Sequence, residues 1–157
     1  MNKVIEADFL PRETNAALSW PNSFGRLGMK EKRRILIVDD DPGTTRLVKV
    51  LLERTGDYLV LEENDATRAH QSALGFRPHL ILLDIAMPQT DGSEVAARIQ
   101  ADHELQNTPI IFLIALVTRV EAKSSLNIQG RPFLAKPVNI PELINAIKEH
   151  LAARAAS

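Results

Sequence analysis

The chain has 157 residues, of which 45% are hydrophobic and 25% charged, values that are ordinary for one globular domain. With 19 basic against 20 acidic side chains, the net charge of −1 indicates neither a nucleic-acid partner nor an anionic membrane surface. The absence of cysteine excludes disulfides and thiolate chemistry. No apolar run approaches the roughly 18 residues that cross a bilayer, and no signal-peptide core is present, so we expect a cytoplasmic protein.

Residues 1–30 differ from the remainder in having two prolines and no sustained hydrophobic period. They are predicted to form a poorly ordered N-terminal extension, and residues 31–157 to form the folded domain. Two alternatives stay open for the extension. It is a docking or dimerising arm anchored by Trp20, or translation starts at Met29 and the preceding residues are not native.

Five short apolar runs predict five strands, at residues 35–38, 58–61, 80–83, 110–114 and 133–135. The runs are continuous rather than alternating, as strands buried on both faces require. Segments with helical spacing lie between them and after the last one. The first of these has an apolar face at Leu47, Val48, Leu51 and Leu52, preceded by Asp41 as N-cap. This alternation predicts a doubly wound α/β fold, with five parallel strands and helices on both faces.

Charged side chains follow three of the predicted strands. Asp39 and Asp40 come after the first, Asp84 after the third and Lys136 after the fifth. In such a sheet these positions converge on the rim at the carboxyl ends of the strands. Carboxylates held close together repel, and a divalent cation that prefers oxygen ligands, Mg²⁺ above all, relieves that repulsion. An aspartate beside the ion can accept a phosphoryl group, with a lysine stabilising the transferred charge.

Three strings carry a resemblance to a known family: ILIVDDDP, LILLDIAMPQTDG and FLAKPV. Asp84 follows Asp40 by 44 residues and precedes Lys136 by 52 residues. In this order and spacing, the strings resemble the signatures of response-regulator receiver domains over about residues 33–153. The resemblance implies a flavodoxin-like sheet with strand order 2-1-3-4-5, and residues 31–157 as the receiver domain.

The family's roles carry over to matching positions as implications of the resemblance. Asp84 is expected to be the phosphorylated residue. Asp39, Asp40 and Asp84 are expected to hold Mg²⁺, with the backbone carbonyl of Ala86 as a further ligand. Lys136 is expected to contact the phosphoryl oxygens.

One of the positions that couple phosphorylation to the surface departs from the family pattern. Receiver domains usually carry Thr or Ser where this chain has Ile114, and Thr118 lies too far along to replace it. Phe133 stands where the family carries an aromatic switch residue. The Lys136–Pro137 bond resembles one that is often cis in the family. We therefore expect Asp84 to be phosphorylated more weakly, with altered coupling to Phe133.

The resulting prediction is a stand-alone signalling phosphoacceptor of a two-component system, not an enzyme in the usual sense. It would receive its phosphoryl group from a sensor histidine kinase or a phosphotransfer protein, and pass the signal to a downstream protein. A homodimer through the last helix stays open. The main alternative is a pseudo-receiver that acts as an interaction module without phosphate, which Ile114 favours. A haloacid-dehalogenase-type phosphatase is disfavoured, because Ala86 occupies the position of its second aspartate.

Overall fold

The computed structural model describes residues 30–115 and 131–156. The chain divides into two units, and the sheet with its helices belongs to the second, Lys32–Ser157. The predicted N-terminal extension lies outside the described residues apart from Lys30, as does the helix expected between the fourth and fifth strands. Within the described ranges, no helix combines the length and the apolar character needed to cross a membrane.

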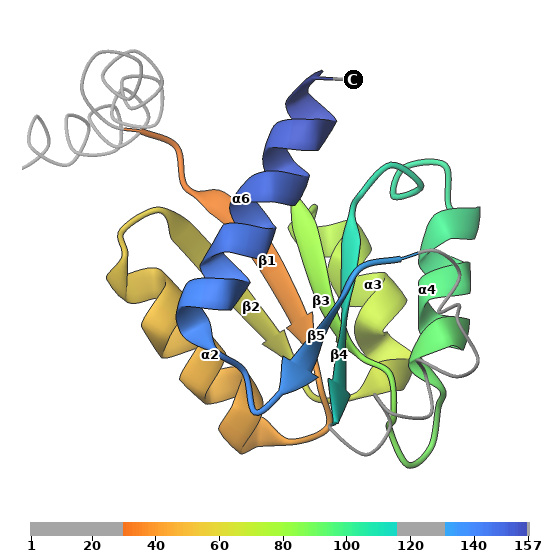
Figure 1. The fold of residues 1–157 in the computed structure, drawn as a ribbon. Helices are drawn as coiled ribbons and strands as arrows, with labels where there is room; N and C mark the ends of the chain where they lie inside the picture. Colours follow the sequence, from red (N-terminus) through yellow and green to blue (C-terminus); the bar gives the residue numbers. More distant parts are fainter. Residues whose placement is uncertain (1–29, 116–130, 157) are drawn as a thin grey trace, which may run out of the picture. The chain divides into compact units, whose positions relative to one another are not determined.

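The strands form one parallel sheet in the order β2-β1-β3-β4-β5, which confirms the predicted strand order (Figure 1). The strand bounds are β1 Arg33–Val38, β2 Tyr58–Glu63, β3 Leu80–Asp84, β4 Ile110–Ala115 and β5 Phe133–Lys136. The helix bounds are α2 Pro42–Arg54, η1 Ala66–Arg68, α3 Ala69–Phe76, α4 Gly92–Ala101 and α6 Ile140–Ala156. The doubly wound α/β prediction is therefore confirmed.

Each face of the sheet has its own hydrophobic core. One core combines side chains of β1, β3 and β4 with α2 and α6, through Val48, Leu52, Leu143 and Ile147. The other lies under α3 and α4, which contribute small side chains such as Ala69, Ala73 and Ala96. Because successive residues of a strand point to opposite faces, both faces of the central strands must be apolar. All of Ile35–Val38 and Leu80–Leu83 are fully buried.

Helix α2 begins where the sequence predicts, but it buries a different set of side chains. The Asp41 carboxylate accepts hydrogen bonds from Gly43 N at 3.0 Å and Thr44 Oγ1 at 2.7 Å, which confirms the N-cap. The prediction that Leu47 lies on the apolar face is wrong, because its side chain is 54% exposed. Thr45 is buried instead, three residues before Val48 on the inward stripe.

The outer edge of the sheet is covered by two side chains of α2. Glu53 Oε2 accepts the Val60 N–H at 2.9 Å, and Lys49 Nζ donates to the Val60 carbonyl at 2.6 Å. The two side chains also form an ion pair at 3.0 Å, with the i, i+4 spacing typical of helices. This pair satisfies backbone groups of β2 that face away from β1, on the side where the described part of the chain places no further strand.

Candidate functional site

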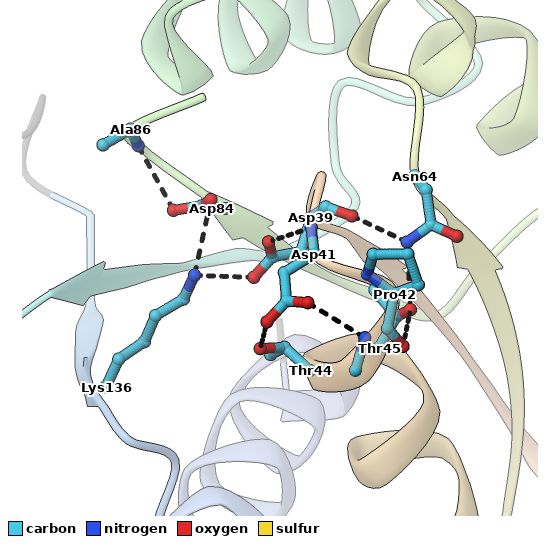
Figure 2. A network of polar contacts seen from close by, with 10 residues as sticks. Asp39, Asp41, Pro42, Thr44, Thr45, Asn64, Asp84, Ala86 and Lys136 are labelled. Atoms are coloured by element: carbon cyan, nitrogen blue, oxygen red, sulfur yellow. Dashed lines mark hydrogen bonds and ion pairs between the residues drawn. The ribbon is translucent and has the colours of Figure 1, made fainter. Parts of the chain in front are cut away.

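The candidate site lies at the carboxyl ends of β1, β3 and β5, where the parallel strands finish at one rim. Asp39 and Asp40 directly follow β1, whereas Asp84 and Lys136 are the last residues of β3 and β5. Figure 2 shows the Lys136 side chain reaching between the carboxylates of Asp39 and Asp84. The structure thus brings together the four charged side chains that the sequence singled out.

Lys136 links the two buried carboxylates. Its Nζ lies 2.7 Å from Asp39 Oδ2 and 3.4 Å from Asp84 Oδ2. Asp39 is fully buried and Asp84 is 4% exposed, so water cannot supply the solvation that both charges lose. Asp39 Oδ1 accepts the Asp41 N–H at 3.0 Å, whereas Oδ2 has the lysine alone as partner among the described residues. Asp39 therefore retains an oxygen that can bind a cation.

The carboxyl group of Asp84 is electrostatically strained. Burial and the neighbouring Asp39 charge raise its pKa to about 6, although Lys136 and the Ala86 N–H act in the opposite direction. Burial alone would lower the pKa of Lys136, but its contacts with Asp39 and Asp84 outweigh burial and raise that pKa. The single lysine charge thus only partly compensates two buried carboxylates. A further cation at this site would be favourable.

The donor set matches a hard divalent cation. Asp39, Asp40 and Asp84 each offer a carboxylate oxygen, and the three oxygens lie within 4.8 Å of one another. The first and third side chains are buried, and the Asp40 side chain is exposed at the mouth of the site. Carboxylate oxygens with an open, water-accessible side are the ligands that Mg²⁺ prefers, since this ion keeps several waters. The residues present therefore fit Mg²⁺.

The loop after Asp84 is held close to the site by backbone contacts. Ala86 N donates to Asp84 Oδ1 at 3.2 Å, and Gly92 N donates to the carbonyl of Ile85 at 2.9 Å. The backbone at Gly92 approaches β3 so closely that a Cβ there would lie 2.4 Å from the carbonyl oxygen of Asp84. Only glycine fits at this position, which also begins α4 after the N-cap Asp91.

The predicted switch positions lie on β4 and β5. Ile114 is fully buried in the apolar core under α3 and α4, and its side chain has no hydroxyl to offer the site. Phe133 begins β5 and is 37% exposed. In the β4–β5 register, Ile114 pairs with Ala135, and Phe112 pairs with Phe133. The Lys136–Pro137 peptide bond is cis.

A second layer of polar residues was missed in the sequence. The Asn64 side chain donates to the carbonyl oxygen of Asp39 at 2.8 Å and to Thr45 Oγ1 at 3.0 Å. Asn64 directly follows β2, so a search of the residues after every strand would have included it. The same search would not have found Thr45, because this residue lies within helix α2, on its buried face.

A five-stranded parallel sheet with an acidic cluster and a lysine at its carboxyl rim defines a receiver-type signalling domain. The response regulator receiver domain model matches residues 35–148, and the chain belongs to this family. Members of the family are the signalling phosphoacceptors of two-component systems, interact with histidine kinases and phosphotransfer proteins, and bind Mg²⁺ at their acidic site.

Similar proteins include response regulators of different lengths. The chain is 33% identical over 126 residues to response regulator Rre1 of Synechocystis, covering 80% of this chain and 54% of that protein. It is 29% identical over 119 residues to the polar-differentiation response regulator DivK of Brucella anthropi, covering 76% of this chain and 96% of DivK. The chain thus spans about half the length of Rre1 but nearly all of DivK.

Solved structures show the same fold. The receiver domain of a sensor histidine kinase from Pseudomonas aeruginosa, described with a magnesium ion in its active site cleft, has a TM-score of 0.67 and 27% identity. That comparison covers 78% of this chain and 99% of the other. A CheY-like receiver domain from Methanospirillum hungatei has a TM-score of 0.66 and 26% identity, covering 80% of this chain and 98% of the other.

Proposed function

We propose that this protein accepts a phosphoryl group on Asp84 with the help of Mg²⁺. The observation that carries the proposal is the cluster itself: three carboxylate oxygens within 4.8 Å, with Lys136 Nζ 3.4 Å from Asp84 Oδ2. In the proposed step, an Asp84 carboxylate oxygen bonds to phosphorus while the bond from phosphorus to a histidine nitrogen of the donor breaks. The leaving imidazole keeps the electron pair and takes a proton from solvent.

The chain's own residues would divide the work of this step. Asp39, Asp40, Asp84 and the backbone carbonyl of Ala86 would hold the Mg²⁺, which neutralises charge on the phosphoryl oxygens when bound. Lys136 already lies between the two buried carboxylates. When the phosphoryl group forms on Asp84, its ammonium would offer donors to the new oxygens.

The absence of a hydroxyl at Ile114 supports a weaker and altered switch. A phosphoryl group on Asp84 would lack one hydrogen bond to a charged group, worth on the order of 1.5–3 kcal/mol. Ile114 is fully buried, among the apolar side chains of the core under α3 and α4. Inward movement of Phe133 from its 37% exposed position would therefore meet a packed core.

The partners proposed are a sensor histidine kinase or a phosphotransfer protein as donor, and a downstream protein that reads the phosphorylated surface. The match covers 96% of DivK, a response regulator, which supports the proposal that a domain of this size can act as a response regulator. Ile114 is the observation that favours the second candidate function, a pseudo-receiver whose surface is read without phosphate.

Intact-mass measurement after incubation with acetyl phosphate and Mg²⁺ tests the first candidate. The wild type is expected to gain one phosphoryl group, and Asp84→Ala to gain none. Ile114→Thr is expected to raise the labelled fraction and to enlarge the beryllofluoride-induced chemical-shift changes at Phe133. No labelling of wild type or of Ile114→Thr, with Mg²⁺ present, would support the pseudo-receiver instead. Equal labelling and equal shifts in these two proteins would contradict the role given to Ile114.

A further inference from the structure

The residues after β2 reach across to the loop that carries the acidic pair. Asn64 Nδ2 lies 2.8 Å from the Asp39 carbonyl oxygen and 3.0 Å from Thr45 Oγ1. In Figure 2 this amide stands beside the start of α2, on the side of Asp39 away from Lys136. On the same strand end, the Glu63 carbonyl accepts the Asp39 N–H at 3.1 Å. The end of β2 therefore holds both backbone polar groups of Asp39.

The orientation of the Asn64 amide is fixed by its two acceptors. A carbonyl oxygen cannot donate, so the NH₂ group must face Asp39. The hydroxyl of Thr45 is buried, and its proton can go to Glu62 Oε1 at 2.9 Å or to the carbonyl oxygen of Pro42 at 3.2 Å. The oxygen of Thr45 thus remains an acceptor for Asn64. An amide held at two points keeps one orientation.

The Asp39 carbonyl belongs to the peptide unit that leads into Asp40. This unit is planar, so holding its oxygen also fixes the positions of the Asp40 nitrogen and Cα, from which the side chain extends. Among the described residues, none hydrogen-bonds the carboxylate of Asp40, which is the exposed member of the acidic cluster. The position of this carboxylate therefore depends on its backbone. That backbone is held by Asn64 on one side and by the bond from Asp41 N to Asp39 Oδ1 on the other.

We propose that Asn64 is a positioning residue of the cation site, holding the Asp39–Asp40 peptide so that the Asp40 carboxylate stays beside Asp39 and Asp84. The inference rests on the proposed function, because it concerns the Mg²⁺ that the same carboxylates would bind. Asn64 acts through the backbone and does not itself touch the ion. Outer residues of this kind commonly change metal affinity by about 10–100-fold when they are removed.

The test is calorimetric titration of the full chain with Mg²⁺. Asn64→Ala is expected to raise the Mg²⁺ Kd about tenfold. Asn145→Ala, which removes an exposed asparagine of α6, is the matched control and is expected to leave the Kd unchanged. Without Mg²⁺, the Asp40 backbone amide resonance is expected to shift in Asn64→Ala and to stay in place in the control. A Kd within about twofold of wild type for Asn64→Ala would overturn the inference.

Two variants of Thr45 test the same proposal if Asn64→Ala does not fold. Thr45→Val removes one acceptor of the Asn64 amide while conserving side-chain volume, and is expected to raise the Kd about threefold. Thr45→Ser keeps the hydroxyl and is expected to bind like wild type, so equal Kd values for these two variants would contradict the proposal. Asp40→Ala distinguishes a failure of the proposed function from a failure of the positioning role of Asn64. If Asp40→Ala binds Mg²⁺ normally, the proposed function itself fails; if only Asn64→Ala binds normally, the positioning role alone fails.

Discussion

Removal of the Asp84 charge is expected to stabilise the metal-free protein. The pKa of Asp84 is raised from 3.8 to about 6, whereas in the unfolded chain the group titrates near its ordinary value. Between these values the folded state binds more protons than the unfolded state, so the free energy of unfolding falls as pH rises from about 4 to about 6. At about 1.36 kcal/mol per pKa unit, the loss reaches about 3 kcal/mol above pH 7. Asp84→Asn should recover this amount at pH 7.5 and about half of it at pH 5.

Urea unfolding at the two pH values, with EDTA present, measures this difference. Asp91→Asn is the matched control. Asp91 is an exposed N-cap whose Oδ1 accepts from Ser93 N at 2.9 Å, and asparagine caps a helix equally well. Saturating Mg²⁺ should cancel most of the difference at pH 7.5, because an ion that binds only the folded wild type stabilises it by about 2.7 kcal/mol at a hundred times its Kd. If Asp84→Asn changed stability by the same amount at pH 5 and pH 7.5, the explanation by buried charge would be refuted.

Three further substitutions test the surroundings of the site. Gly92→Ala should lower the free energy of unfolding by about 3 kcal/mol, because the new Cβ would lie 2.4 Å from the Asp84 carbonyl oxygen; an unchanged urea midpoint would contradict the close approach. Lys136→Met should destabilise the metal-free protein by about 3–5 kcal/mol near neutral pH and by less at pH 5, where Asp84 gains a proton; a loss that is independent of pH would count against this account. Glu53→Gln should cost about 1 kcal/mol at pH 7 and less at pH 4, which lies below the ordinary glutamate pKa of 4.5. The Val60 N–H and Lys49 outweigh burial and lower the pKa of Glu53, so its contribution is present at neutral pH and is lost as pH falls through that lowered value; thermal unfolding at both pH values checks this.

The fold could be predicted from the sequence because its central strands are continuous apolar runs. The predicted bounds of β1 and β3 differ from the observed ones by at most two residues. The run at residues 58–61 stopped short because β2 continues through Glu62 and Glu63, which are polar. Glu63 is nevertheless buried, where its carboxylate accepts from the Asp65 N–H and from Ser72. Such partners lie outside the strand, so periodicity within the strand cannot indicate them.

The candidate site could be predicted as a set of residues but not as a geometry. Strand-end positions identified Asp39, Asp84 and Lys136, because parallel strands bring their carboxyl ends together. The sequence could not show that Asp39 and Asp84 are buried and share one lysine, since burial depends on how neighbouring loops cover the rim. The error at Leu47 has a similar cause. Helix α2 faces the sheet along Thr45, Val48 and Leu52, and the hydrophobicity of Leu47 alone does not reveal the rotation of the helix.

The ion pair on the outer edge of β2 has a consequence for association between chains. A strand added from another molecule would have to bond the Val60 N–H and C=O, which Glu53 and Lys49 already occupy. Such a strand would first have to displace both side chains from Val60 and break the hydrogen bonds they make there. Beside Val60, the turn of α2 from Lys49 to Glu53 thus makes the hydrogen bonds that a sixth strand would make. Growth of the sheet into a larger aggregate is thereby discouraged along this margin.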